Sequence, residues 1–475
     1  MIWRWLERHA DHAPDKVALR FEDAATTYAA LACSVERTAA ALSARGVGRG
    51  DRVGFLGQNH PSQLVLLFAL ARLGAIQVPL NWRLAAPEWT FILEDSGTRL
   101  LCATAEMLAS AQAAAPHGCD VVQADALSGS GGDPVPATGE DSDPLLLVYT
   151  SGTTGRPKGA LLDQRALLFN ALNGLHAFDL TGADRVLTVL PLFHVGGLNI
   201  QTTPALYAGA EVILHPRFDA EAFFDAVERE RPTLSLVVPA VMAALARHPR
   251  WRDADLSSLR AVGAGSSDVP VPLIEAFHAK GVPVQQIYGA TETCPTAIVQ
   301  TRAEALAAPG SIGRPAMHVE ARLDPLSHEI QLRGPSVLRG YWKRDDALLP
   351  GGWFPTGDVG HVDPEGRFWF TDRLKHVIIS GGENIYPAEV ERVLVAAPGV
   401  MEGAVVGRAD PQWGEVPVAV VVPGEGFDAT AVLAHFEGRI ARFKRPKAVV
   451  VVEALPRTAL GKVATGALKA IVGKG

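Results

Sequence analysis

The first three hundred residues alternate short apolar runs with longer amphipathic ones. Residues 17–21 and 52–56 read as strands because apolar and β-branched side chains dominate them. Residues 28–45 and 61–73 follow them and carry apolar positions at helical spacing. Such an order predicts an α/β fold, in which helices cover sheets that are largely parallel.

The same alternation continues along the chain and gives a full set of expected elements. The predicted strands are 145–148, 212–214, 234–238, 259–262 and 284–287, and the predicted helices are 166–178, 220–231, 240–248 and 272–280. The segment 128–144 is rich in Gly, Ser, Pro and acidic residues, so we expect a flexible surface loop with no apolar anchor.

A domain boundary is expected near residues 372–376, where a dense charged stretch follows a glycine-punctuated segment. Beyond it the pattern restarts with helices at 388–397 and 429–440 and strands at 403–406, 416–422 and 449–452. About a hundred residues suffice for a small independent domain. We therefore predict a large N-terminal domain (1–372), a hinge (373–375) and a small mobile α+β domain (376–475).

Composition and charge narrow the class of protein. The 475 residues are 48% apolar and 20% charged, which is ordinary globular usage, and the net charge of -7 offers no basic surface for nucleic acid. No export signal and no apolar run of membrane-spanning length is visible, which favours the cytoplasm. The four cysteines, Cys33, Cys102, Cys119 and Cys294, are scattered and lack zinc-ligand spacing, so free thiols are expected.

The segment 149–159, Tyr-Thr-Ser-Gly-Thr-Thr-Gly-Arg-Pro-Lys-Gly, is the most informative part of the chain. It follows a predicted strand and precedes a predicted helix, and its glycines, hydroxyls and Lys158 suit a phosphate group. The spacing differs from the common P-loop GxxxxGK[ST]. On these residues alone, a solvated Ser/Thr/Gly loop remains the alternative.

This segment resembles the signature of the adenylate-forming superfamily, which includes acyl-CoA synthetases, and further motifs of that family follow in order. The resemblance implies an ATP site at the loop and at later positions. Its residues are Thr150, Ser151, Gly152, Thr153, Thr154, Gly155, Lys158, Tyr288, Gly289, Thr291, Glu292, Asp358, Arg373, Asn384 and Lys462.

Two motifs in the large domain resemble the family's acyl and metal segments. The segment 191–197 contains His194, whose counterparts border the acyl pocket, although a lone histidine is more often structural. The expected acyl pocket comprises His194, Gly196, Gly197, Ala264, Gly265 and Ala290. Mg²⁺ prefers hard oxygen ligands, a role that Glu292 and Thr154 would fill.

Later motifs resemble the ribose site, the hinge and the adenylation loop. Asp358 is expected to accept hydrogen bonds from both ribose hydroxyls, because a carboxylate only accepts. Phe354-Pro355 stands where relatives commonly have Arg or Tyr-Arg. Lys375 takes the hinge position, and Lys462 matches the lysine that adenylation requires. The expected catalytic residues are Lys462, Glu292, Thr154 and His194.

The C-terminal region carries the residues that imply coenzyme A. The loop 380–389 resembles the one that lines the pantetheine tunnel in CoA ligases, and its glycines allow close approach to a thin ligand. The expected CoA contacts are Gly381, Gly382, Trp413, Phe443, Arg445 and Lys447. An exposed basic turn is the alternative for the last two.

The resemblance implies an ATP-dependent acid:CoA ligase that forms an acyl-AMP and then a thioester, with ATP, Mg²⁺ and CoA. Segments expected to line the acyl site hold no Lys or Arg, which favours an aromatic or medium-chain monocarboxylate. Residues 248–256 look like feruloyl-CoA synthetases, and 283–294 with 191–199 like O-succinylbenzoate:CoA ligases. Three other functions compete with this interpretation: a stand-alone adenylation enzyme that loads a carrier protein, a luciferase-like oxygenase and a non-catalytic scaffold. A homodimer is compatible with the sequence.

Overall fold

The computed structural model describes residues 1–129, 134–150, 157–265, 269–344, 346–380, 383–411, 413–458, 461 and 463–473. The chain divides into two compact units. The first comprises Met1–Ala321, Leu332–Phe354 and Gly366–Phe368, and the second comprises Arg322–Gln331, Pro355–Glu365 and Trp369–Gly475. The predicted hinge at 373–375 and the mobility of the small domain stay predictions.

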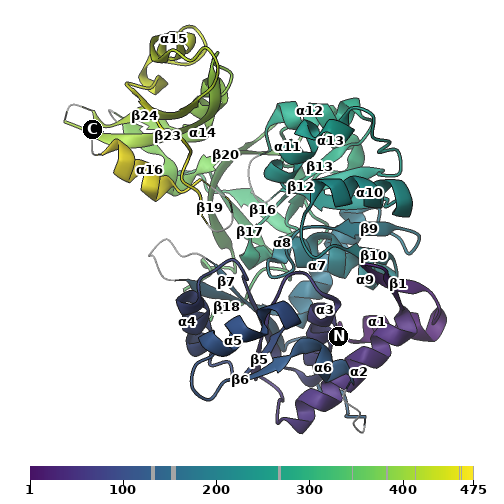
Figure 1. Ribbon diagram of the computed structural model, residues 1–475. Coiled ribbons are helices and arrows are strands. Elements are labelled where there is room, and N and C mark those ends of the chain that lie inside the picture. The colour runs from purple at the N-terminus through teal and green to yellow at the C-terminus, as the bar shows by residue number, and fades with distance from the viewer. Residues whose placement is uncertain are drawn as a thin grey trace. The chain divides into compact units, whose positions relative to one another are not determined.

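The first unit is built on two large sheets (Figure 1). The nine-stranded sheet has the order β15-β14-β13-β12-β11-β9-β10-β1-β2, and β1, β10, β9, β11, β12 and β13 run parallel. Its strands are β1 (Val17–Phe21), β2 (Ala24–Thr27), β9 (Arg185–Thr188), β10 (Glu211–Leu214), β11 (Leu234–Val237), β12 (Ala261–Gly265), β13 (Val284–Tyr288), β14 (Ile298–Val299) and β15 (Arg314–Pro315).

The second sheet of this unit has seven strands in the order β18-β8-β7-β4-β3-β5-β6. They are β3 (Arg52–Leu56), β4 (Ile76–Leu80), β5 (Leu100–Ala103), β6 (Asp120–Gln123), β7 (Pro144–Thr150), β8 (Lys158–Asp163) and β18 (Gly340–Tyr341). Five of them, β7, β4, β3, β5 and β6, are parallel, and their apolar side chains form a core with helix α4 (Ala86–Ser96).

Helices cover both sheets, as expected for parallel strands that are buried on two faces. In Figure 1 the teal helices α12 and α13 lie beside β13. The remaining helices of the unit are α1 (Arg4–His12), α2 (Tyr28–Ala44), α3 (Pro61–Leu73), α5 (Leu108–Ala114), α6 (Ala124–Gly129), α7 (Gln164–Phe178), α8 (Val195–Gly197), α9 (Thr203–Ala208), α10 (Ala220–Glu230), α11 (Pro239–Arg247), α12 (Val271–Ala279) and α13 (Arg302–Ala307). The α/β prediction is confirmed.

The second unit contains a five-stranded sheet, β22-β21-β24-β23 with β25 paired to β24. Its elements are β21 (Ile378–Ser380), β22 (Glu383–Ile385), α14 (Pro387–Leu394), β23 (Val400–Asp410), β24 (Gly414–Pro423), α15 (Ala429–His435), β25 (Val449–Val451) and α16 (Thr465–Val472). Most of a four-stranded sheet also belongs here, in the order β16 (Glu320–Leu323), β17 (Glu329–Arg333), β19 (Phe354–Val362) and β20 (Phe368–Arg373). The prediction of a small C-terminal α+β domain is confirmed.

The helix expected at 429–440 is shorter than the sequence pattern predicts. It ends at His435, because Gly438 adopts a left-handed backbone with φ of 71° and Arg439 donates to the carbonyl of His435. The strand expected at 259–262 is shifted to Ala261–Gly265, where small residues pair with both neighbouring strands. Pairing partners therefore override the weak strand propensity of glycine and alanine.

The expected order of strand, glycine-rich loop and helix is wrong. Residues 158–163 form β8, which pairs antiparallel with β7 so that Thr150 lies opposite Lys158. Helix α7 begins one strand later, where the Asp163 carboxylate accepts a hydrogen bond from the Ala166 amide at 2.7 Å. The loop therefore connects two strands of a hairpin, and β8 separates it from the amino end of α7.

The expectation of an unanchored loop at 128–144 is also wrong for its second half. The amides of Thr138 and Gly139 both donate to the Arg72 carbonyl at 2.9 Å. Asp143 is buried and forms an ion pair with Arg49. Polar contacts anchor residues 138–143, which a search for apolar anchors could not reveal.

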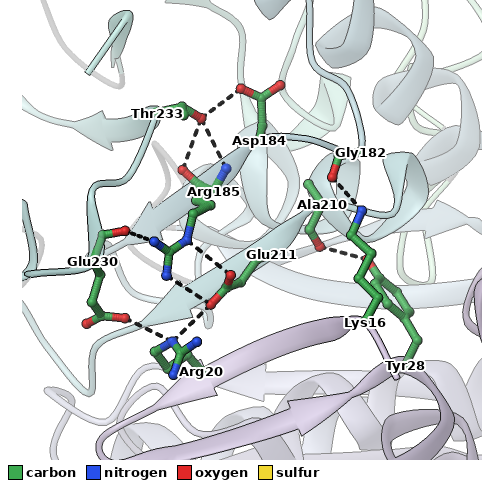
Figure 2. A network of polar contacts seen from close by, with 10 residues as sticks. All are labelled: Lys16, Arg20, Tyr28, Gly182, Asp184, Arg185, Ala210, Glu211, Glu230 and Thr233. Carbon is green, nitrogen blue, oxygen red and sulfur yellow. Dashed lines mark hydrogen bonds and ion pairs between the residues drawn. The ribbon is translucent and has the colours of Figure 1, made fainter. Parts of the chain in front are cut away.

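A polar network links β1 to other strands of the nine-stranded sheet (Figure 2). The Glu211 carboxylate accepts hydrogen bonds from Arg20 at 2.9 Å and from Arg185 at 3.1 Å. The Thr233 hydroxyl donates to Asp184 at 2.7 Å and accepts from the Arg185 amide. These contacts link β1, β9 and β10 to the start of β11, and so fix the sheet that carries the candidate site.

Asp184 is expected to make stability depend on acid pH. Burial alone would raise the pKa of this carboxyl, but hydrogen bonds from Arg260, Thr233 and the Thr181 amide outweigh it and lower the pKa below its usual value of about 4. A depressed pKa in the folded state stabilises the protein above the unfolded-state pKa, and this stabilisation is lost as the pH falls through the folded-state pKa.

We therefore expect Asp184→Asn to lower the free energy of unfolding by about 1–3 kcal/mol at pH 7. The difference from the unchanged protein should shrink as the pH falls below about 4, where the unfolded-state carboxyl takes up a proton, and should be smallest below the lower folded-state pKa, where both states are protonated. Denaturant titrations at pH 7 and pH 3 measure both values. An equal difference at the two pH values would contradict the assignment.

Candidate active site

Four candidate segments lie at the carboxyl ends of parallel strands in the nine-stranded sheet. The segments that contain His194 and Ala240 follow β9 and β11, and Gly265 and Tyr288 are the last residues of β12 and β13. The carboxyl ends of parallel strands meet at one edge of a sheet, which is where α/β proteins usually bind ligands. The topology therefore brings these segments to a common edge.

The segment before His194 is held by the buried side-chain amides of Asn59 and Gln63. Asn59 accepts a hydrogen bond from the Leu192 amide at 2.7 Å and donates to the Leu190 carbonyl at 3.0 Å. Gln63 donates to the Leu192 carbonyl at 3.0 Å. The sequence analysis did not identify these positioning residues, because nothing local links them to a segment some 130 residues away.

His194 starts a tight turn formed by α8. Its Nδ1 accepts a hydrogen bond from the Gly196 amide at 3.0 Å, so the proton of the neutral ring lies on Nε2. A Cβ atom on Gly197 would lie 2.3 Å from the Pro191 carbonyl oxygen, so the turn requires glycine there. The histidine ring is thus oriented by the backbone that carries it.

Close approaches also shape the ends of β12 and β13. A Cβ on Gly265 would lie 2.3 Å from the Ile287 carbonyl oxygen, and one on Gly289 would lie 1.7 Å from that of Pro295. The Ala290 amide donates to Thr293 Oγ1 at 2.9 Å in the turn that follows. The structure therefore places Ala264 and Gly265 on the strand beside Tyr288, Gly289 and Ala290.

Tyr341 joins two of the predicted ATP residues. Its hydroxyl donates to Glu292 Oε1 at 2.8 Å, and the ammonium of Lys158 lies 5.4 Å from the centre of its ring. The three side chains come from β8, β18 and the short helix η4 (Thr291–Thr293). The sequence analysis missed Tyr341, since only pairing of β18 with β8 brings it to the site.

The environment keeps Tyr341 protonated. Burial raises the pKa of its hydroxyl, and the neighbouring Glu292 carboxylate raises it further by charge and by hydrogen bonding. The neutral phenol donates a hydrogen bond to the Glu292 carboxylate and holds the carboxylate in place. Glu292 is thereby oriented by an aromatic side chain that also contacts a cation of the glycine-rich hairpin.

Several predicted residues lie outside the described residues. They are Ser151, Gly152, Thr153, Thr154, Gly155, Gly381, Gly382 and Lys462. The backbones of Lys375 and Asn384 are described, in the turn η5 (Leu374–His376) and in β22, but their side chains are not. The roles assigned to these residues stay predictions.

The second unit brings the predicted ribose residues together. Arg373 Nε lies 2.6 Å from Asp358 Oδ1, and both residues belong to the four-stranded sheet. Thr356 and Gly357 fix the backbone before Asp358 by bonding to the Ile330 carbonyl and to the Glu329 carboxylate at 2.7 Å each. The unusual Phe354-Pro355 pair thus begins β19, and the residues that follow it in this strand are well bonded.

Replacing Asp358 with asparagine is expected to raise the KM for ATP by about 10- to 100-fold. The reason is that charge-assisted hydrogen bonds to the ribose hydroxyls would be lost. Pyrophosphate release with ATP and with 2′-deoxy-ATP measures the effect. The unchanged enzyme should prefer ATP, and the variant should discriminate less.

Asp363→Asn provides a control, because Asp363 accepts a hydrogen bond from Trp369 on the same sheet and is not a predicted nucleotide residue. It should leave the preference for ATP unchanged. An Asp358→Asn enzyme with an unaltered preference would contradict the ribose assignment.

The predicted CoA residues of the second unit differ in exposure and partners. Trp413 and Phe443 are 48% and 39% exposed. Arg445 lies 3.4 Å from Glu437, and Lys447 is exposed while its amide donates to the Pro417 carbonyl at 2.8 Å. Among the predicted CoA residues, Trp413 and Phe443 therefore present apolar surface to solvent.

The chain belongs to the family of AMP-binding enzymes, which it matches over residues 6–342, and it matches the C-terminal domain of these enzymes over residues 389–462. The resemblance to the adenylate-forming superfamily is thereby confirmed.

Two curated relatives span almost the whole chain. The chain is 49% identical to the indoleacetate–CoA ligase of Aromatoleum aromaticum, over 99% of this chain and 98% of the relative. It is 44% identical to a feruloyl-CoA synthase of Amycolatopsis, over 98% of each.

Two solved structures of one enzyme have the same fold as this chain. The o-succinylbenzoate CoA synthetase of Bacillus subtilis, in complex with its acyl-adenylate intermediate, has a TM-score of 0.90 and 33% identity over 98% of each chain. In complex with ATP and a magnesium ion, the same enzyme has a TM-score of 0.89 and 32% identity, over 98% of this chain and 99% of that one.

Because it belongs to this family and is similar to these relatives over almost its whole length, the chain is an AMP-forming acyl-CoA synthetase, that is, an ATP-dependent acid:CoA ligase. The prediction of the enzyme class is confirmed, and a small-molecule acid, ATP and CoA are its substrates. Among the described helices, none combines the length and the apolar character needed to cross a membrane.

Proposed function

We propose that this ligase acts on aromatic monocarboxylic acids, with arylacetic acids of the indole-3-acetate type as the preferred class. The 49% identity to an indoleacetate–CoA ligase over nearly the whole chain carries the proposal. The acyl segments add support, because Gly196, Gly197, Ala264, Gly265 and Ala290 have little or no side chain and leave room for a ring system.

The absence of cationic residues from these segments argues against a dicarboxylate. O-succinylbenzoate carries a second carboxylate, and burying it without a partner costs free energy. No Lys or Arg occurs in 191–199, 262–267 or 290–294. For this reason we place O-succinylbenzoate second, as the alternative substrate. A carrier protein is the alternative acceptor for the acyl group.

In the first half-reaction, a carboxylate oxygen of the acid attacks the α-phosphorus of ATP in line, and pyrophosphate leaves. Lys158 and Lys462 would offset the charge of the phosphates. Glu292, oriented by Tyr341, and the hydroxyl of Thr154 would hold Mg²⁺, which offsets phosphate charge when bound. Hard oxygen donors suit this ion, and few protein ligands suffice when phosphates supply the others.

In the second half-reaction, the sulfur of CoA bonds to the acyl carbon, the bond from that carbon to the AMP oxygen breaks, and the thiol proton is released. His194 would border the reacting carbonyl. We assign CoA binding to Gly381, Gly382, Trp413, Phe443, Arg445 and Lys447. The small domain would rotate about Lys375 between the two steps, so that the Gly381–Gly382 loop replaces the Lys462 loop.

We also propose that the enzyme acts in the cytoplasm, because ATP and CoA are supplied there. We further propose that it assembles as a homodimer. Sedimentation equilibrium of the purified chain tests the assembly. A monomer across the working concentration range would contradict it.

A substrate panel tests the function. Indole-3-acetate, phenylacetate, ferulate, benzoate, 2-succinylbenzoate and octanoate would be compared by kcat/KM, with the CoA product identified by mass. We expect the highest value with an arylacetate. A preference for 2-succinylbenzoate or octanoate would overturn the proposed substrate class.

A further inference from the structure

The π-helical turn η2 (Leu198–Thr202), which follows α8, contains a buried amide with no partner. Gln201 is only 1% exposed, and neither its Nε2 nor its Oε1 has a hydrogen-bond partner among the described residues. Its neighbours in the turn are satisfied, since Thr202 donates to the Gly197 carbonyl at 2.7 Å and Asn199 lies 3.4 Å from the Cys294 sulfur. Gln201 is therefore the exception within its own turn.

An unmatched amide at such a position has a cost. Both its donor and its acceptor lose water on folding and gain nothing from the chain in return. A methionine of similar size would fill the same space without this cost. Turns of π type occur frequently at functional sites. The missing partners of Gln201 are thus expected to come from a bound molecule.

The position of Gln201 points to the acyl site. A Cβ atom on Gly263 of β12 would lie 3.2 Å from Gln201 Nε2, with the side chains of Leu236 and Ile287 also close. Gly263 and Gly265 lie on the same face of β12, because side-chain positions alternate along a strand. Gly265 is a predicted wall of the acyl pocket, and His194 lies seven residues before Gln201 on the same segment.

We propose that Gln201 is the specificity-determining residue for the ring of the acid. Its amide hydrogen-bonds a polar group on the ring, such as an indole N–H or a phenolic hydroxyl. The glycine at 263 lets this amide pack directly against β12, beside the apolar side chains of Leu236 and Ile287. This inference rests on the proposed function, because it assumes an aromatic acid in that pocket.

Pairs of acids that differ only in the polar group test the inference. Indole-3-acetate would be compared with 1-benzothiophene-3-acetate, and 4-hydroxyphenylacetate with 4-fluorophenylacetate. A site built to bond a polar group discriminates against an analogue that lacks it. We expect the unchanged enzyme to prefer the polar member of at least one pair by about 10- to 100-fold in kcat/KM.

Gln201→Met should reduce that preference at least tenfold, and the melting temperature should stay equal or rise, because an unmatched amide is removed. A purely structural role would instead lower the melting temperature and leave the preference intact. Gln201→Asn withdraws the amide by one methylene and should change the preference in the same direction, which provides a second variant if the first does not fold.

Gln300→Met is the matched control. Gln300 is equally buried, but its amide donates to the Ala308 carbonyl at 2.9 Å and accepts from the Gln286 amide at 3.0 Å. The control should melt at a lower temperature with an unchanged preference between the paired acids. An unchanged preference in the Gln201 variants, with aryl-CoA still formed, would overturn the inference alone. Failure of the unchanged enzyme to form any aryl-CoA would overturn the proposed function.

Discussion

Replacing Lys462 with alanine is expected to slow acyl-adenylate formation by about 10²- to 10³-fold. The lysine is assigned to the charge that develops around the α-phosphate during displacement, and removal of one such preorganised donor typically has an effect of this size. The second half-reaction does not use that charge. Thioester formation from preformed acyl-AMP and CoA should therefore stay within a few-fold of normal.

The two half-reactions can be measured separately. Pyrophosphate release reports adenylation, and the mass of the CoA product formed from added acyl-AMP reports thioester formation. Lys469→Ala is the control, because Lys469 is an exposed lysine of α16 that has no assigned role. Similar losses in both assays for Lys462→Ala would contradict its assignment to the first half-reaction.

Glu292→Gln is expected to lower adenylation by about 10²-fold. The substitution keeps the size of the side chain and removes the charge that would bind Mg²⁺. The rate should also require a higher Mg²⁺ concentration for half-saturation. Pyrophosphate release across a Mg²⁺ titration at saturating ATP measures both effects.

Tyr341→Phe is the matched variant for this prediction. It removes the hydroxyl that donates to Glu292 at 2.8 Å but keeps the ring near Lys158. We expect a loss of about 5- to 20-fold, because one hydrogen bond to a charged group is removed. Since the pKa of Tyr341 is raised, the contribution of its hydroxyl should be constant from pH 6 to pH 9. A variant of Glu292 with an unaltered Mg²⁺ requirement would contradict the metal assignment.

Local patterns of apolar residues were sufficient to predict several strands and helices of the large unit. The strands that became β3, β11 and β13, and helix α3, are visible in the sequence because each has its own apolar period and its own turn residues. Resemblance to family motifs also led to the prediction of Glu292, Asp358 and Arg373 as site residues without knowledge of their neighbours. The structure adds the 2.6 Å contact between the last two.

Contacts between distant segments could not be predicted in the same way. Tyr341 reaches Glu292 across 49 positions, and Asn59 reaches Leu192 across 133. The β8 strand was missed because its apolar run is short and lies directly before a helix, so its pairing with β7 decides its conformation. The unmatched amide of Gln201 becomes visible only when burial and hydrogen bonds are both known.

The most direct measurement is the identity and ratio of the products formed from ATP, CoA and an arylacetic acid. We predict one AMP, one pyrophosphate and one aryl-CoA for each acid consumed, and an aryl-adenylate bound to the enzyme when CoA is omitted. The formation of ADP and phosphate, or an adenylate that persists unchanged after CoA is added, would contradict activation by AMP followed by transfer to CoA.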